Sequence, residues 1–225
     1  MKVKERMNKN VITVDLNSSL TEAFQLLKEN NIRRLPVMNK GRVIGIVTIS
    51  DLNKAAPSTA TSLSMHEINY LLIKTKIKDI LPKKQIVITI GPENYIETAA
   101  KLMRRNNISS LPVIDENGNL VGIVTETDIF DALIEILGVK QAHSRIDFYT
   151  YERRGALAEI TGMIAAKDKN ILNTVAYYDE SKNLYKLIFR LEELNVDDVV
   201  KELENRGYEV ESVIIRQEEE WTNNA

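Results

Sequence analysis

Two short segments of the chain place a threonine and an aspartate at the same spacing. Thr48 and Asp51 stand three residues apart in one segment, and Thr125 and Asp128 in the other, each after an apolar run. A carboxylate there can accept hydrogen bonds from two vicinal hydroxyls, such as those of a ribose, and the threonine offers a small donor to phosphate or ribose oxygens. Alternatively, each aspartate is only the N-cap of the helix that follows. The pattern therefore predicts two ribose-binding sites or two helix caps.

The composition excludes several other kinds of site. The 225 residues include no cysteine and two histidines, His66 and His143, which excludes thiolate metal ligands, cysteine nucleophiles and His-rich metal centres. A net charge of −2 gives the molecule no electrostatic reason to bind nucleic acid. No apolar run approaches the roughly 18 residues of a membrane span, and the N-terminus lacks the apolar core of a signal peptide. We therefore expect a cytoplasmic protein without a metal and away from membranes.

The elements that must position the threonine–aspartate pairs occur twice. Residues 11–38 align with residues 87–114, and residues 41–52 with residues 118–129, with 17 identities in 40 aligned positions. Each copy predicts a short strand, an amphipathic helix that ends at an Asn-Asn pair, and a strand entered through proline. A hairpin turn, a continuous apolar strand and the start of a second helix follow. Each repeat is thus predicted to be β-α-β-β-α.

Two such repeats, each with a Pro-Val strand followed by Gly-x-x-Thr-x-x-Asp, resemble the CBS domain pair, or Bateman module. The resemblance covers about residues 1–140. It implies a pseudo-two-fold disc with two clefts that commonly bind adenosine compounds, including AMP, ADP, ATP and S-adenosylmethionine. The positions that it assigns to the nucleotide are Thr48, Asp51, Thr125, Asp128, Arg33, Arg34, Ser109, Ser110, Thr13 and Thr89, the last two on the adenine side.

The two repeats differ in the residues before Leu-Pro-Val. The first repeat has Arg33 and Arg34 there, and the second has Ser109 and Ser110. Because a guanidinium binds phosphate through two parallel hydrogen bonds, the cleft that the arginines serve should prefer a phosphorylated ligand. The cleft that the serines serve should take a neutral or weakly charged ligand, or none. A solvated arginine pair after a helix is one alternative. Positive charge shared between the two clefts is another, because the pseudo-two-fold arrangement brings the repeats close together.

The C-terminal third does not match the repeat. Its periodicity predicts the order β-α-β-β-α-β, which is ferredoxin-like, and its Gly155-Ala156-Leu157 and Asn170-Ile171 segments resemble the ACT domain. The resemblance implies a regulatory domain that often binds an amino acid and pairs side by side with a second copy. Its effector positions would be Thr150, Glu152, Gly155 and Asn170. Glu152 would repel an α-carboxylate, so a dimerisation and signalling domain without a ligand is the alternative.

The charge distribution indicates a domain boundary near residue 143. Residues 1–143 carry 19 basic and 15 acidic side chains, and residues 144–225 carry 11 and 17. We expect His143 in this linker, and His66 at the start of a helix, to be surface residues. The fold class predicted is α/β (α+β). The predicted domains are CBS domain 1 (1–57), a connecting loop and helix (58–75), CBS domain 2 (76–140), an ACT domain (144–217) and an acidic tail (218–225).

A CBS pair followed by one ACT domain is similar to bacterial acetoin utilisation proteins. The resemblance implies a non-catalytic sensor of an adenosine nucleotide in acetoin or related carbon metabolism, which acts on an unidentified effector protein. We also expect a homodimer that forms through ACT sheets and CBS helices, including Ile129, Leu133, Ile136 and Leu137. The alternatives are an interaction protein with empty clefts, an amino-acid sensor, or an enzyme, although no catalytic constellation is present in the sequence.

Overall fold

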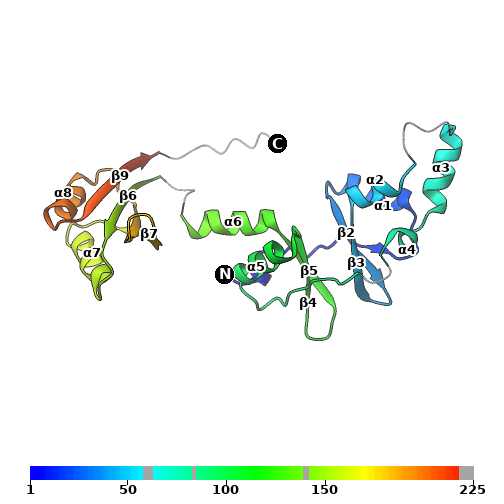
Figure 1. Cartoon of the computed structure of the whole chain (residues 1–225), viewed down its shortest axis with the longest axis horizontal. Coiled ribbons are helices and arrows are strands. Elements are labelled where there is room, and N and C mark those ends of the chain that lie inside the picture. Colours follow the sequence, from blue (N-terminus) through cyan, green and yellow to red (C-terminus); the bar gives the residue numbers. More distant parts are fainter. Residues whose placement is uncertain (58–62, 83–84, 139–141, 218–225) are drawn as a thin grey trace. The chain divides into compact units, whose positions relative to one another are not determined.

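The computed structural model describes residues 1–57, 63–82, 85–138 and 142–217 (Figure 1). The chain divides into two compact units, Met1–Phe130 and Asp131–Ala225. Within the described residues, no helix is long and apolar enough to cross a membrane. The same residues contain no cluster of three or more histidine, aspartate or glutamate side chains that could hold a metal ion.

The first repeat forms a three-stranded sheet with two helices. Its elements are η1 (Val3–Glu5), β1 (Val14–Asp15), α1 (Leu20–Glu29), β2 (Arg34–Asn39), β3 (Arg42–Thr48) and α2 (Ile49–Ala55). Strand β1 runs parallel to β2, and β2 pairs antiparallel with β3. The hairpin between β2 and β3 turns at Lys40 and Gly41, whose φ angles of 48° and 77° are those of a type I′ turn. The predicted hairpin is therefore confirmed.

The second repeat follows two connecting helices, α3 (Met65–Lys74) and α4 (Ile77–Ile80). Its elements are α5 (Ile96–Asn106), β4 (Ser110–Ile114), β5 (Leu120–Thr125) and α6 (Glu126–Ile136), the last of which extends past the boundary between the units. Asn31 and Asn107 follow α1 and α5 with φ angles of 49° and 52°. These left-handed residues confirm that the Asn-Asn pairs end both helices.

The first strand of each repeat is much shorter than predicted. Of residues 11–14, only Val14 lies in a strand, and of residues 87–90, only Ile90 forms a β-bridge, with Val113. The chain leaves the sheet before these points because it crosses from one repeat to the other. Asn8, for example, bridges to Ile123 of the second repeat. The two crossing segments consequently contribute to the site described below.

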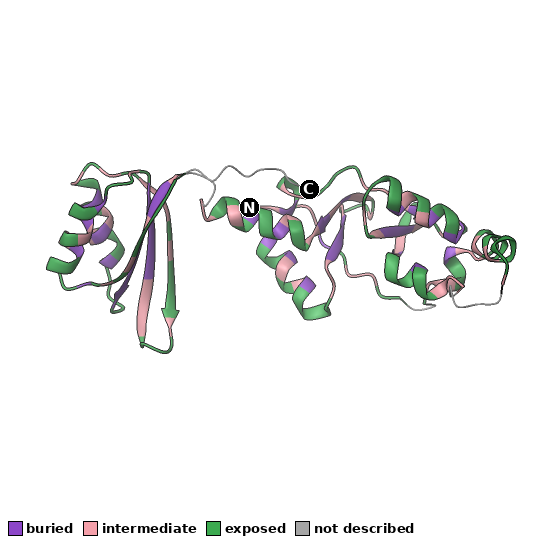
Figure 2. Cartoon of the chain, turned by 90° about the horizontal axis from the view of Figure 1, so that it is seen from above, coloured by how far each residue is buried: buried purple, intermediate pink, exposed green. Residues whose placement is uncertain are grey.

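Helix α1 shows how the sequence builds the core of this unit. The Ser19 hydroxyl oxygen accepts a hydrogen bond from the Glu22 backbone N–H, and the Glu22 carboxylate accepts one from the Ser19 backbone N–H, which forms a capping box. Leu20, Ala23 and Leu27 then lie on one face and are almost completely buried. Figure 2 shows how buried and exposed residues alternate along the helices. They pack in a cluster with residues of β2, β3 and α2. Burial of each leucine stabilises the fold by about 1.5–3 kcal/mol, and the sheet edge beside it is thereby held in place.

The second unit has the predicted β-α-β-β-α-β order. Its elements are β6 (His143–Thr150), α7 (Ala156–Ala165), β7 (Ile171–Asp179), β8 (Leu184–Leu191), α8 (Asp197–Asn205) and β9 (Glu209–Arg216). The strands form one antiparallel sheet in the order β7-β8-β6-β9. Phe148 of β6 and Phe189 of β8 stack at 5.7 Å within a core that both helices cover.

The expectation that His143 is a surface residue is wrong. His143 begins β6, pairs with Arg216 of β9 and is 1% exposed. The linker therefore ends before this residue, because His143 already belongs to β6, which lies between β8 and β9 in the sheet.

Candidate functional site

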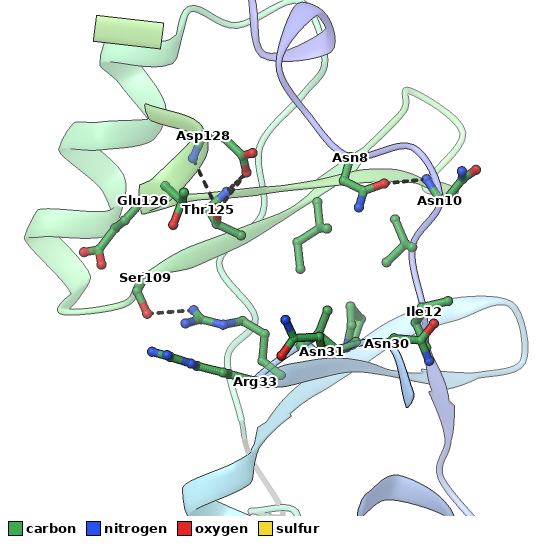
Figure 3. Close-up of a pocket in the computed structure, with 16 residues that line it drawn as sticks. Asn8, Asn10, Ile12, Asn30, Asn31, Arg33, Ser109, Thr125, Glu126 and Asp128 are labelled. Carbon is green, nitrogen blue, oxygen red and sulfur yellow. Dashed lines mark hydrogen bonds between the residues drawn. The ribbon is translucent and has the colours of Figure 1, made fainter. Parts of the chain in front are cut away.

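Two cavities lie in the first unit, and matching segments of the two repeats line them. The cavity that we call the larger cleft has a volume of about 800 Å³, and residues from within 8–12, 30–36 and 123–128, with Ser109, line it (Figure 3). The smaller cleft has a volume of about 250 Å³, and residues from within 46–51, 85–88 and 107–110, with Arg34, line it. Each cleft thus combines a crossing segment, the loop after a helix, and the strand–helix junction of the other repeat.

The threonine–aspartate pairs lie one in each cleft, with the same geometry. Asp51 Oδ2 accepts hydrogen bonds from the backbone N–H of Thr48 at 2.9 Å and from its hydroxyl at 2.7 Å. Asp128 Oδ2 accepts the equivalent bonds from Thr125 at 2.7 and 2.8 Å. Pair Thr48–Asp51 lines the smaller cleft, and pair Thr125–Asp128 the larger. The structure therefore brings each pair to a cavity, as the repeats predict.

The alternative that these aspartates are N-caps is wrong in one respect. Thr48 is the N-cap of α2, and Asp51 is the third helical residue of a capping box, whose N–H donates to Thr48 Oγ1. A threonine can hold the N-cap position because its backbone is extended there while its hydroxyl accepts from the helix. The threonine hydroxyl proton is directed to the aspartate. Asp51 Oδ1 and Asp128 Oδ1 accept no hydrogen bond from the described part of the chain.

A guanidinium and a hydroxyl meet between the two clefts. Arg34 Nη1 donates to Ser109 Oγ at 2.6 Å, and both residues line both cavities. Burial lowers the pKa of the half-buried Arg34 guanidinium; the Glu126 carboxylate opposes this shift, and the charge of Arg33 adds to it. The packing of the repeats thus places Arg34 and Ser109 between the clefts, which agrees with the alternative of shared positive charge and not with a separate arginine cleft and serine cleft.

The other two members of these pairs are not shared. Arg33 is exposed and lines only the larger cleft (Figure 3). Ser110 is 3% exposed and lines only the smaller cleft. Thr13 and Thr89 line neither cleft, whereas their neighbours Ile12 and Ile88 do. The two adenine-side positions that the resemblance assigned are therefore not part of the cavity linings, and the residue before each of them is.

Sequence reasoning missed the residues that close the clefts beside β3 and β5. In the smaller cleft, the Gln85 side chain accepts a hydrogen bond from Ile46 N at 3.1 Å and donates one to Ile46 O at 3.2 Å. In the larger cleft, the backbone of Asn8 makes the matching pair of bonds to Ile123, at 2.9 and 3.0 Å. The same strand position is thus bridged by a side chain in one cleft and by the backbone in the other.

Two matching glycines were the available signal for these bridges. A Cβ on Gly45 would lie 2.4 Å from Gln85 Oε1, and one on Gly122 would lie 2.5 Å from Met7 Sδ. Both glycines belong to the duplicated Gly-Ile-Val-Thr segment. A glycine inside a strand marks a close approach of another part of the chain, and here that part is a crossing segment.

The second unit contains a cavity of about 300 Å³ beside the start of α7. Three of the four predicted effector residues, Thr150, Glu152 and Gly155, line it. Arg153, which is paired with Glu159, two tyrosines (Tyr151 and Tyr185) and several apolar residues complete the lining. Gly155 has a φ of 80° and precedes the helix as its N-cap. The structure thus brings these three residues to one cavity at the end of β6.

Asn170 does not line this cavity. Its side-chain amide donates to Glu192 Oε2 at 2.7 Å, and its backbone N–H donates to the Glu193 carboxylate at 3.1 Å. These bonds hold Asn170 at the start of β7 beside the end of β8, where it has the role of a loop anchor.

Comparison with known proteins identifies the first unit. The family model described as "CBS domain" matches residues 3–58 and 77–135. A CBS domain-containing protein of Dictyostelium discoideum is 38% identical over 136 residues, which are 60% of this chain and 92% of that protein. The family match lies on the two repeats and leaves the residues after 135 outside.

Two solved structures are similar to the same part of the chain. The CBS domain pair of protein MJ0100, in complex with 5′-methylthioadenosine and S-adenosyl-L-methionine, is 32% identical and covers 59% of this chain and 95% of that chain, with a TM-score of 0.48. A candidate acetoin utilization protein (AcuB) from Vibrio cholerae is 25% identical and covers 62% and 94%, with a TM-score of 0.49. The family match and the shared repeats show that the chain belongs to the CBS domain family.

Proposed function

We propose that the CBS pair binds an adenosine nucleotide in its two clefts and that the protein is a non-catalytic sensor. The observation that carries the proposal is the duplicated aspartate. In each cleft, threonine holds Oδ2 and leaves Oδ1 without a hydrogen bond from a described residue. A carboxylate oriented in this way can accept a charge-assisted hydrogen bond from a ribose hydroxyl. The Arg34 guanidinium, which lines both clefts, is the group suited to a phosphate.

The experiment is calorimetric titration of the full chain with adenosine, AMP, ADP, ATP and S-adenosylmethionine. Asp51→Ala should weaken the smaller cleft and Asp128→Ala the larger cleft, each by about 10–150-fold, because each loses a charge-assisted hydrogen bond. If both single variants and the double variant bind as the unmodified protein does, the ribose assignment is wrong. Product analysis after incubation with nucleotides separates a sensor from an enzyme, since a sensor returns its ligand unchanged.

A third capping box provides a matched control. Glu67 Oε2 accepts hydrogen bonds from the backbone N–H and the hydroxyl of Ser64, both at 2.8 Å, at the start of α3. Glu67 lines neither cleft. Glu67→Ala therefore removes a comparable helix cap without removing a ligand contact. It should bind nucleotides as the unmodified protein does, which distinguishes loss of a contact from loss of a cap.

The cavity of the second unit supports a second candidate function, that of an ACT-type effector domain. Thr150, Glu152 and Gly155 line it together with Arg153, so the cavity has a carboxylate that favours an ammonium group and a guanidinium that favours a carboxylate. Titration with a panel of amino acids and with their decarboxylated amines tests this candidate. If no member binds, the second unit is better explained as a dimerisation and signalling domain.

We further propose a homodimer. The edge strands β7 and β9 of the second unit expose Tyr177, Tyr178, Val213, Ile214 and Ile215, each by 39–57%. Unpaired edge groups beside apolar side chains favour pairing with a second sheet. Light scattering at micromolar concentration should give twice the 25.6 kDa chain mass, and a mass near 26 kDa contradicts the dimer.

The apolar stripe of α6 differs from the expected one. Ile129 is 7% exposed and belongs to the core, whereas Phe130, Leu133 and Ile136 are exposed by 63, 42 and 42%. These three residues recur every third position and are the part of α6 available to a second copy. The proposed domain bounds, the cytoplasmic location, the effector protein and the connection to acetoin metabolism remain predictions.

A further inference from the structure

The two clefts share one basic side chain. Arg34 and Ser109 come from different repeats, lie 75 residues apart in the sequence, and both line both cavities. The Arg34 Nη1 to Ser109 Oγ distance of 2.6 Å shows that the guanidinium is held between the clefts and is not confined to one of them.

The clefts depend on this guanidinium to different degrees. The larger cleft also has Arg33, which is exposed, and the carboxylates of Glu126 and Asp128 (Figure 3). Among the described residues that line the smaller cleft, Arg34 is the one basic side chain and Asp51 the one acidic side chain. Among the described lining residues, Arg34 is thus the cation that can pair with a phosphate in the smaller cleft, and in the larger cleft it adds to Arg33.

One guanidinium cannot serve two phosphates fully at the same time. A bidentate bond to phosphate uses two parallel N–H groups of a planar fork, and the fork has one orientation at a time. Arg34 is half-buried, so water compensates poorly for a contact that it loses. Two phosphates drawn to one site also repel each other across a partly desolvated region.

We propose that the two clefts compete for Arg34, so that a phosphate-bearing adenosine ligand in one cleft weakens the binding of a second one in the other. The inference rests on the proposed nucleotide binding and adds a regulatory property to it. Because coupling between two sites is reciprocal, the loss of affinity is the same whichever cleft is filled first. Adenosine, which has no phosphate, should fill both clefts independently.

The test compares AMP with adenosine by calorimetric titration of the full chain. Asp51→Ala and Asp128→Ala weaken one cleft each, so the first AMP that binds to either variant reports the separate AMP affinity of the other cleft. In the unmodified protein, the second AMP should bind about tenfold or more weakly than this separate affinity, the scale of one charge-assisted contact. In Arg34→Ala, both clefts should bind AMP more weakly than in the unmodified protein. The affinity of each cleft should then be the same, within about twofold, whether or not the other cleft holds AMP.

Arg33→Ala is the matched control, because Arg33 is adjacent, has the same charge and lines only the larger cleft. It should weaken AMP in the larger cleft and retain the competition. Ser109→Ala gives a second variant that keeps Arg34. Its first AMP should bind about 2–10-fold more tightly, since the guanidinium no longer has to leave a hydrogen bond.

Each outcome decides between the two proposals. Independent binding of two AMP molecules to the unmodified protein overturns the competition and leaves nucleotide sensing intact. Equal coupling for adenosine, equal coupling in Arg34→Ala, or an unchanged first affinity in Ser109→Ala also overturns it. If the smaller cleft binds neither AMP nor adenosine, the proposed competition is overturned as well. If no adenosine compound binds to either cleft, it is the proposed function that fails.

Discussion

The two clefts are built from the same repeat but are not equivalent. At the strand–helix junctions they agree closely: the Thr48 and Thr125 hydroxyls donate to their aspartates at 2.7 and 2.8 Å. The loops after α1 and α5 also match, since an asparagine with a left-handed backbone follows each helix. The parts that agree are those that local chemistry determines, namely the capping boxes and the helix ends.

The clefts differ where one repeat meets the other. A backbone pair from Asn8 borders the larger cleft, while the Gln85 side chain borders the smaller one. Glu126 stands in the larger cleft where the aligned residue of the other repeat is Ile49. The cavity volumes, about 800 and 250 Å³, differ accordingly. The duplication thus keeps the scaffold and varies the side chains that a ligand would meet.

The largest expected effect comes from removing the two arginines that line the clefts, Arg33 and Arg34. Arg33→Ala/Arg34→Ala should weaken ADP and ATP by about 10–150-fold or more, because the phosphates lose bidentate contacts, and adenosine by much less. The salt dependence of binding should also become flatter. Titrations at two ionic strengths measure both effects. An equal loss for adenosine and ATP would show that these arginines are structural.

The next effect compares the two strand glycines, Gly122 and Gly45, against which another part of the chain packs closely. Gly122→Val places side-chain atoms against Met7 and the Asn8 carbonyl oxygen, which a Cβ alone would meet at 2.5 and 3.2 Å. Overpacking of this kind costs about 1–3 kcal/mol in the free energy of unfolding. Gly45→Ala should cost less, since the nearest atom, Gln85 Oε1, ends a flexible side chain. Denaturant unfolding measures both; a larger loss for Gly45→Ala would contradict the comparison.

A smaller effect concerns the width of the smaller cleft. Gln85→Ala removes the two hydrogen bonds to Ile46 and should lower the free energy of unfolding by about 1 kcal/mol. It should also admit larger ligands to the smaller cleft and leave the larger cleft unchanged. Titration with ATP checks this in an Asp128→Ala background, which weakens the larger cleft. No gain in ATP affinity there would mean that Gln85 does not limit the cavity.

The smallest effect concerns the ion pairs between the N-terminal segment, which leads into the larger cleft, and Glu93 of the second repeat. Lys2 and Lys4 donate to Glu93 at 2.7 and 2.6 Å and lower the pKa of Glu93 from its ordinary 4.5 to about 2. A carboxylate with a lowered pKa stabilises the fold above pH 4.5, and this contribution is lost as the pH falls through about 2. Glu93→Gln should therefore lose less stability than the unmodified protein between pH 4.5 and 2. Parallel slopes in denaturant unfolding would show that the pairs do not contribute, as is common for exposed ion pairs.

Much of the fold could be predicted from local patterns. Apolar periodicity predicted α1 and α5, the Asn-Asn pairs predicted where they end, and Lys40-Gly41 predicted the hairpin turn. These signals act within a few residues, so they survive without knowledge of the rest of the chain. The short first strands were predicted less well, because Val11 and Ile12 are β-branched but lie outside the sheet, where they line a cavity.

The sequence by itself determined the repeat, the order of elements in both units, and the presence of a threonine–aspartate pair at each strand–helix junction. Only the tertiary structure decided that Arg34 meets Ser109, that Gln85 bridges Ile46, that Asn170 lies away from the cavity of the second unit, and that His143 is buried. The physical reason is range. Caps, turns and periodicity are set by neighbours along the chain, whereas these contacts join residues 22–75 positions apart, or a strand to its neighbours in the sheet, and depend on how whole elements pack.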